Sequence, residues 1–228
     1  YCMYGGEVSF YQIADYLISL SADQRCSNQL RAKVINGCYS ISEGTFEGNS
    51  DYGAIQDLDE IPSAFLEGWM DPFLAEGCLP IVETNRGCPF SCTFCVWGIS
   101  ALNKLRQFSL ERVKADLSYI AHSKYRAPVI VFADANFGII KRDVKIAEHI
   151  RELYEETKSF SRVQLYWSKS YKPHMVDIGK ALGHLTETYV AFQSLDPLVL
   201  ANIKRRNINT DELMNLISLL KQYADSAQ

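Results

Sequence analysis

Apolar positions in the second part of this 228-residue chain follow two alternating patterns. Short apolar runs typical of buried strands lie at residues 79–84, 128–133, 163–167 and 188–192. Between and after these runs, apolar side chains recur every three or four residues, as they do on one face of a helix. The predicted helix faces comprise Leu110, Val113, Leu117 and Ile120, then Ile146, Ile150 and Leu153, then residues 175–185, and finally Leu213, Leu216, Ile217 and Leu220. Strands that alternate with helices predict βα units and a parallel sheet.

Polar residues at the start of three of these helices, Ser109, Asp143 and Thr210, are expected to cap them. Four βα units within roughly 150 residues are half of an eight-fold barrel, for which about 250 residues are typical. The predicted fold class is therefore α/β, with a partial parallel (β/α) barrel. Active sites of such barrels lie at the C-terminal ends of the strands, so candidate residues can be ranked by position.

The beginning of the chain is less regular. Residues 7–20 show a helical pattern with Phe10 on the apolar face, and the preceding turn Gly5-Gly6-Glu7 is typical of a strand–turn–helix unit in a doubly wound sheet. Two short strands are predicted at residues 34–39 and 44–49. An acidic stretch with prolines and aromatic residues follows and predicts an ordered linker. We expect three parts, at residues 1–56, 57–78 and 79–228.

Composition and charge argue against several classes of protein. The net charge is −4, and the basic run Lys204-Arg205-Arg206 is too short to neutralise many phosphates, so nucleic acid is not expected as a main partner. No stretch is long enough for a membrane span, and the first residues do not resemble a signal peptide. The seven cysteines are an odd number with three in one cluster, which disfavours a disulfide framework and favours the reducing cytoplasm.

The three clustered cysteines are Cys88, Cys92 and Cys95, spaced C-x3-C-x2-C directly after the first strand of the predicted barrel. Thiolates bind soft metals and iron–sulfur clusters. Three thiolates on one loop can hold three irons of a cubane and leave the fourth iron open, whereas structural zinc normally has four protein ligands. The motif therefore predicts a [4Fe–4S] cluster, with buried or zinc-bound cysteines as the alternative.

With Phe94 before its last cysteine, this motif resembles that of the radical S-adenosylmethionine (SAM) enzymes. The string Arg86-Gly87-Cys88-Pro89-Phe90 and the upstream residues 58–63 resemble the cobalamin-dependent, class B methylase-like branch. The resemblance implies a barrel of six βα units, of which about four are present, so the chain is expected to be a fragment. It also implies that residues 1–56 are the tail of a doubly wound cobalamin-binding domain.

The resemblance further implies the function and the cofactors. A [4Fe–4S] cluster would cleave SAM reductively to a 5′-deoxyadenosyl radical, and methylcobalamin would then methylate an unactivated carbon of a small-molecule substrate. An electron donor such as flavodoxin or ferredoxin is the implied protein partner. A weak assignment places Gly6 and Glu7 at the cobalamin, although a generic βα turn explains them equally and the usual Asp-x-His-x-x-Gly element is absent. The alternatives are a radical SAM rearrangement or methylthiotransferase enzyme, and a non-catalytic iron–sulfur or zinc module.

Candidate SAM-binding residues also follow from the resemblance. Phe94 would pack against the adenine or only against its own loop, and Trp97 flanks the cluster. After the second strand, Asp134 and Asn136 replace a Gly-Gly-Glu-like turn that meets the SAM amino group. The alternative for Asp134 is to cap the following turn. After the third strand, Ser168 could face either the active-site pocket or the solvent.

The last candidates follow the fourth predicted strand. The stretch from Gln193 and Ser194 to Arg205 resembles a family segment in which the Gln binds the ribose and the Arg binds the SAM carboxylate. An Arg fork suits a carboxylate geometrically. Arg206 is the alternative if the alignment shifts by one residue, and a surface cation is the alternative role for Arg205.

Overall fold

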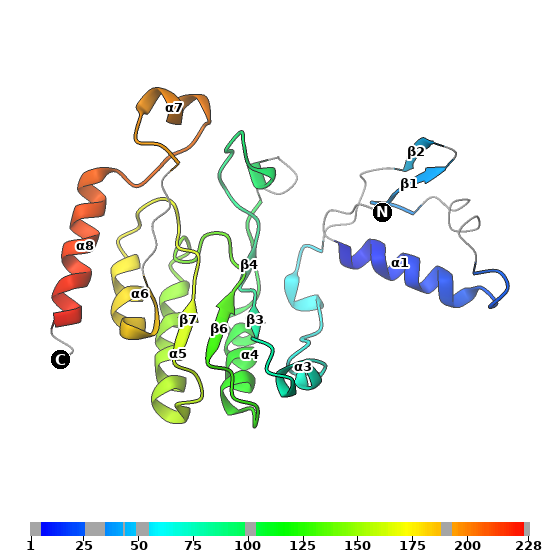
Figure 1. The fold of residues 1–228 in the computed structure, drawn as a ribbon, viewed down its shortest axis with the longest axis horizontal. Coiled ribbons are helices and arrows are strands. Elements are labelled where there is room, and N and C mark those ends of the chain that lie inside the picture. The colour runs from blue at the N-terminus through cyan, green and yellow to red at the C-terminus, as the bar shows by residue number, and fades with distance from the viewer. Residues whose placement is uncertain are drawn as a thin grey trace. The chain divides into compact units, whose positions relative to one another are not determined.

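The computed structural model describes residues 6–25, 35–42, 44–48, 55–98, 104–187 and 193–225. The chain divides into two compact units, residues 1–56 and residues 57–228 (Figure 1). The predicted fourth strand at residues 188–192 lies outside the described residues, as does Gly5 of the predicted turn.

The first unit contains helix α1 (Gly6–Ser19) and an antiparallel hairpin of β1 (Tyr39–Ser42) and β2 (Thr45–Gly48). The predicted helix and second strand are confirmed. The first strand was predicted at residues 34–39 and begins only at Tyr39, because its pairing with β2 sets its position. Phe10 is 63% exposed, so the predicted apolar face of α1 is only partly covered within the described residues.

The second unit is built on a parallel sheet with the order β3 (Ile81–Val82), β6 (Val129–Phe132) and β7 (Arg162–Gln164). In its register, Val131 lies between Ile81 and Gln164. Ile81 is 61% exposed and Gln164 is also exposed, whereas the neighbouring row Val82–Phe132 is buried. The sheet therefore has one covered face and one open face. The predicted α/β fold with an unclosed parallel barrel is confirmed for the described part.

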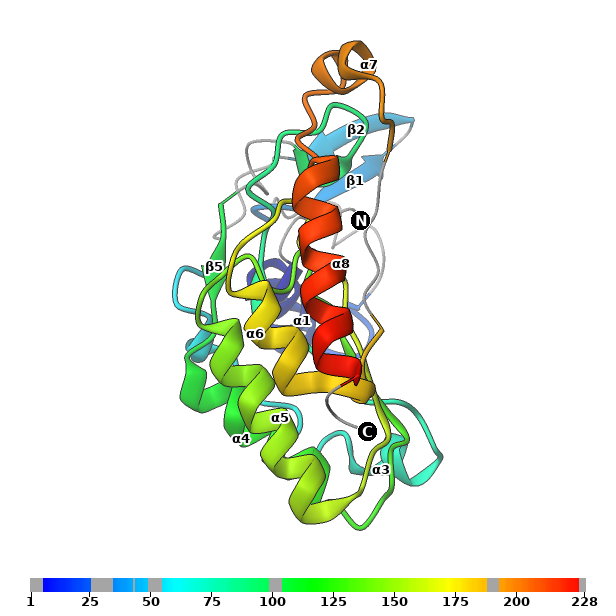
Figure 2. The same ribbon diagram turned by 90° about the vertical axis from the view of Figure 1, so that its left-hand side faces the viewer.

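Three helices cover the buried face of the sheet and lie side by side along it (Figures 1 and 2). They are α4 (Leu110–His122), α5 (Asp143–Thr157) and α6 (Met175–Leu182), the last continued by η3 (Gly183–Leu185). Their apolar faces close one core with the strands. That core includes Val113, Leu117, Ile130, Phe132, Ile146, Ile150, Val163, Leu165, Ile178 and Leu182.

Helix α8 (Thr210–Asp225) packs against α6 through a second, smaller cluster. Leu213 and the fully buried Leu216 face this cluster as predicted, whereas Ile217 is 36% exposed. The side chain of Leu220 lies outside the described residues. Among the described helices, none combines the length and the apolar character that crossing a membrane requires.

Residues 57–78, expected to be a linker, form part of the second unit. Helices η1 (Leu58–Glu60) and α3 (Asp71–Ala75) pack beside α4, with Leu58 and Phe65 in the main core. The Tyr119 hydroxyl donates a 2.7 Å hydrogen bond to Asp71, and Arg112 donates one of 2.8 Å to the Ile61 carbonyl. Of the aromatic residues of this stretch, only Phe65 is buried, whereas Trp69 and Phe73 are 57% and 53% exposed, so hydrogen bonds and apolar packing attach the stretch to α4.

Helix caps follow the prediction at one position of three. Ser109 caps α4 by accepting from the Arg112 N–H at 3.1 Å. Asp143 does not cap α5: its carboxylate accepts instead from the Gly138 N–H of the preceding loop at 2.8 Å. The cap of α8 is not Thr210 but Asn209, which forms a reciprocal capping box with Glu212.

Helix α7 (Pro197–Asn202) and the strands β4 (Asn85–Arg86) and β5 (Arg106–Gln107) were not predicted. Helix α7 is capped by Asp196, and its Asp-Pro start is a usable sequence signal. The pair β4 and β5 is antiparallel and joins residues on either side of the cysteine motif. Such two-residue strands carry no periodicity from which they could be predicted.

Candidate active site

The three clustered cysteines lie on a loop that follows β3 and is closed at its base by the β4–β5 pair. Cys88 and Cys92 are 2% and 4% exposed, Cys95 is half-buried, and all three are free thiols. Gly87 adopts a φ of +102° directly before Cys88, a conformation that residues with a Cβ rarely adopt. The loop therefore turns inward at the first cysteine because a glycine precedes it.

The donor set of this loop fits an iron–sulfur cluster. In the described residues, no three His, Cys, Asp or Glu side chains converge on a position for a single metal ion. Thiolates that ligate different irons of a cubane need not converge in this way. The loop offers three unbridged thiols close in sequence, two of them withdrawn from solvent, at the end of the sheet where barrel active sites lie.

Asn136 contacts the cysteine loop directly. Its Nδ2 donates a hydrogen bond to Cys88 Sγ at 3.2 Å, and the side chain is 1% exposed. Its Oδ1 is buried and has no hydrogen-bond partner in the protein. An amide N–H directed at a thiolate sulfur stabilises negative charge on that sulfur.

Asp134 holds the segment that leads into the cysteine loop. One carboxylate oxygen accepts from the backbone N–H groups of Thr84 and Asn85, at 2.8 and 2.9 Å, and the other accepts from the Thr84 hydroxyl at 2.7 Å. Burial raises the pKa of Asp134 from 3.8 to about 6, although these hydrogen bonds oppose the shift. These contacts join Asp134 to the segment before the cysteines and not to the turn that follows it, and a role of Asp134 toward SAM stays a prediction.

Arg142 forms hydrogen bonds with the residues at both ends of the same loop. Its guanidinium donates to the Thr84 carbonyl at 3.1 Å and to the Phe108 carbonyl, and the Phe108 N–H donates to the same Thr84 carbonyl at 3.1 Å. The neighbouring Asp143 is fully buried, and burial raises its pKa to about 6. The start of α5 thus fixes the residues before and after the cysteines.

A second group of candidate residues lies around α7. Arg205 is 5% exposed and donates from Nε to Asn207 Oδ1 at 2.8 Å, while Asn207 donates to the Ser194 carbonyl at 2.8 Å. The Thr93 N–H of the cysteine loop donates to the Ile203 carbonyl at the end of α7, at 3.0 Å. These contacts bring the Ser194–Arg205 segment beside the cysteine loop.

Comparison with known proteins identifies the family of this chain. The model of the radical SAM superfamily matches residues 82–225. The chain belongs to the radical SAM superfamily. The match includes the cysteine loop, the parallel sheet and helices α4 to α8.

Two curated relatives of this radical SAM chain are methyltransferases by name. TokK of Streptomyces tokunonensis, a cobalamin-dependent radical SAM methyltransferase, is 34% identical over 73% of this chain and 25% of its own length. The 2-(S-pantetheinyl)-carbapenam-3-carboxylate methyltransferase of Streptantibioticus cattleyicolor is 33% identical over 72% of this chain and 25% of its own length. The aligned part therefore corresponds to about a quarter of each relative.

Solved structures share the fold at low sequence identity. The cobalamin-dependent SAM radical enzyme OxsB, with aqua-cobalamin and SAM bound, matches 94% of this chain and 30% of its own, with a TM-score of 0.59 and 18% identity. The radical SAM methyltransferase TsrM from Kitasatospora setae matches 96% of this chain and 43% of its own, with a TM-score of 0.65 and 15% identity. At such identities the likeness shows the fold.

Three of the remaining predicted site residues of the radical SAM chain are exposed to solvent, and two belong to the other unit. On the cysteine loop, Phe94 is 53% and Trp97 40% exposed, and Gln193 is also exposed. Gly6 and Glu7 form the first turn of α1 in the other unit. Their roles toward SAM and cobalamin stay predictions.

Two aromatic residues that follow β7, Tyr166 and Trp167, point to opposite faces of the sheet. Trp167 is buried in the main core and donates to the Glu187 carbonyl at 3.2 Å, whereas Tyr166 is 55% exposed. Ser168 is 4% exposed, and its N–H donates to the Phe137 carbonyl at 2.8 Å. Tyr166 therefore lies on the face that the interior of a barrel would use.

Three residues that shape this radical SAM site were not predicted from the sequence: Thr84, Asn85 and Arg142. They hold the cysteine loop through contacts with residues about 50 or more positions away. A cation before a helix and a polar pair after a strand are common sequence patterns that indicate no particular function. No local signal in the sequence could have identified them.

Replacing Asn136 by leucine should lower the reduction potential of a cluster bound at Cys88. Without the N–H···S hydrogen bond, the added electron is less well stabilised. We expect roughly a tenfold change in the one-electron equilibrium, which corresponds to about 59 mV. A redox titration followed by electron paramagnetic resonance measures this shift.

The matched control is Asn85→Leu. Asn85 is also buried, but its amide donates to Thr84 Oγ1 at 3.1 Å and not to sulfur. An equal shift in both variants, or none in Asn136→Leu, would show that the hydrogen bond to Cys88 does not set the potential.

Proposed function

We propose that the protein containing this chain is a cobalamin-dependent radical SAM methyltransferase that methylates an unactivated carbon of a small-molecule substrate. The observation that carries the proposal is the loop of Cys88, Cys92 and Cys95, unbridged and partly buried beside Asn136. The names of the two bacterial relatives support methyl transfer and the use of cobalamin. Unbridged cysteines also suit a cytoplasmic location.

In this proposal Cys88, Cys92 and Cys95 hold a [4Fe–4S] cluster, and SAM occupies the neighbouring end of the sheet. When bound, the cluster supplies the electron that cleaves SAM, and cobalamin supplies the methyl group. Asn136 hydrogen-bonds a cluster ligand, and its buried, unpaired Oδ1 can accept from an ammonium donor. Asp134 and Arg142 keep the loop in place.

Further side chains are proposed to bind SAM or to enclose the substrate. Arg205 offers a guanidinium for the SAM carboxylate, and Phe94 and Trp97 offer exposed rings on the cysteine loop. The open face with Ile81, Val131 and Tyr166 is where substrate and SAM would be enclosed and water excluded. Residues 1–56 are proposed to belong to a cobalamin-binding domain, and a flavodoxin or ferredoxin is the proposed electron donor.

The test is anaerobic reconstitution of the full-length protein with iron, sulfide and cobalamin. We expect about four irons per chain and, with SAM and a reductant, release of both 5′-deoxyadenosine and S-adenosylhomocysteine. Release of 5′-deoxyadenosine alone would exclude methyl transfer. Bound zinc without any SAM cleavage would exclude the radical enzyme altogether.

A further inference from the structure

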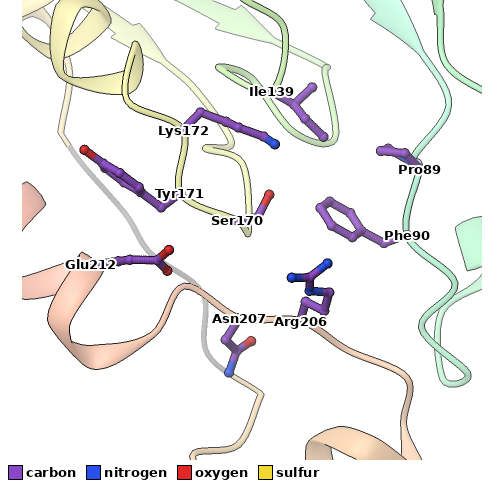
Figure 3. A pocket seen from close by; sticks show the side chains of 9 residues that line it. All are labelled: Pro89, Phe90, Ile139, Ser170, Tyr171, Lys172, Arg206, Asn207 and Glu212. Carbon is purple, nitrogen blue, oxygen red and sulfur yellow. The ribbon is translucent and has the colours of Figure 1, made fainter.

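A cleft of about 300 Å³ lies against the cysteine loop (Figure 3). One wall is formed by Pro89 and Phe90, which stand between the proposed ligands Cys88 and Cys92. The opposite wall comes from the loop before α6 and the segment before α8. The cleft is therefore bounded by the same loop that carries the thiols.

The cleft lies at the C-terminal end of the parallel sheet, among the loops that follow its strands. Its other segments, around Ile139, Ser170–Lys172 and Arg206–Glu212, lead directly into α5, α6 and α8. Helices α5 and α6 cover the buried face of the sheet, opposite the open face with Ile81. The cleft and the proposed SAM site thus share one end of the sheet, and the reduction by dithionite in the test below distinguishes a docking surface from a SAM or substrate site.

Cations dominate the ionisable groups of the cleft. Lys172 and Arg206 both extend toward Phe90 (Figure 3), and Lys169 Nζ lies 5.8 Å from the centre of the Phe90 ring. Glu212 also lines the cleft, but one of its carboxylate oxygens accepts from the Asn209 N–H at 3.0 Å in the cap of α8. In a chain of net charge −4, this is a local basic patch.

We propose that this cleft and its basic rim are the docking surface for an acidic one-electron carrier protein. The inference rests on the proposed function, because a cluster that cleaves SAM must be reduced from outside the chain. One electron leaves the carrier and enters the cluster, which passes from the 2+ to the 1+ state, and no atom is transferred. The basic patch attracts the acidic carrier, and the half-buried ring of Phe90, between two cluster ligands, lies beside the patch.

The charge pattern favours a carrier protein over a neutral small molecule. Complementary charge mainly accelerates encounter and orients the partner, as a transient electron-transfer complex requires. Such complexes have small interfaces, which suits a patch formed by three loops. The apolar wall of Pro89, Phe90 and Ile139 provides contact area beside the charges.

The test variant is Lys172→Glu in the reconstituted full-length protein, with an acidic flavodoxin as the probe. We expect cluster reduction by reduced flavodoxin to become about tenfold slower at low ionic strength, since reversing one charge weakens steering. Binding of oxidised flavodoxin, measured by calorimetry, should weaken in parallel. Both differences should shrink in about 0.5 M salt, where exposed charges are screened. Reduction by dithionite should stay at the wild-type rate.

The matched control is Lys124→Glu, which reverses an exposed lysine at the other end of the sheet, before β6. It should react with flavodoxin as the wild type does. The docking proposal is overturned if Lys172→Glu accepts electrons and binds flavodoxin normally. It is also overturned if the variant cleaves SAM more slowly with dithionite as well, because the cleft would then serve SAM or substrate. A wild type that cleaves no SAM with dithionite would instead overturn the proposed function.

Discussion

The Cys92→Ala variant is expected to lose iron–sulfur cluster assembly and all SAM cleavage. Cys92 is 4% exposed and is the middle cysteine of the loop, and its sequence neighbours Ser91 and Thr93 carry no thiol. A cubane held by two cysteines instead of three lacks a protein ligand for one more iron. Iron content after anaerobic reconstitution and the yield of 5′-deoxyadenosine measure the loss.

Cys78→Ala is the control for this variant. Cys78 is a free, exposed cysteine of the same unit that stands before β3, outside the loop. It should reconstitute and cleave SAM like the wild type. Full iron content in Cys92→Ala would end the ligand assignment, and loss in both variants would point to a general effect of removing thiols.

The Asp134→Ala variant is expected to lose about 3 kcal/mol of unfolding free energy and to assemble the cluster poorly. The substitution leaves two backbone N–H groups and one hydroxyl buried without an acceptor, and each such group costs about 1–3 kcal/mol. The affected groups belong to Thr84 and Asn85, which lead into the cysteine loop. Urea unfolding measures the stability, and iron content measures the assembly.

Asp134→Asn separates hydrogen bonding from charge. Its amide can accept from the two backbone N–H groups and donate to the Thr84 hydroxyl, so stability near neutral pH should stay close to that of the wild type. In the wild type, folded Asp134 keeps its proton up to a pKa of about 6, whereas the unfolded chain loses it near 3.8. The unfolding free energy should therefore fall as pH rises between these values. This fall should be smaller in Asp134→Asn, and an identical pH profile would contradict the raised pKa.

Much of the second unit could be predicted because its signals are local. The apolar period of 3.6 residues identified helices α4, α5, α6 and α8, and the apolar run at residues 128–133 identified β6. The cysteine motif is local too, and its family match covers residues 82–225. These patterns can be recognised in the sequence because each element must bury its own apolar face, whichever elements it packs against.

The less accurate predictions concern short contacts between side chains and backbone. Asp143 was expected to cap α5, but its carboxylate is directed to the Gly138 N–H, and Asn209 caps α8 in place of Thr210. Several polar residues near a helix start can compete for this role, and packing of the preceding loop selects among them. Helix ends are uncertain by a residue or two for the same reason.

The sequence by itself determined the βα alternation, the α/β class and the three clustered cysteines, because periodicity and ligand spacing are properties of neighbouring residues. Only the tertiary structure decided which groups surround the cysteine loop. It placed Asn136 on Cys88, joined Asp134 to Thr84, and set Lys172 and Arg206 beside Phe90. These residues come from different loops that meet at one end of the sheet. Contacts between loops depend on the strand register and on helix packing, which leave no periodic trace in the chain.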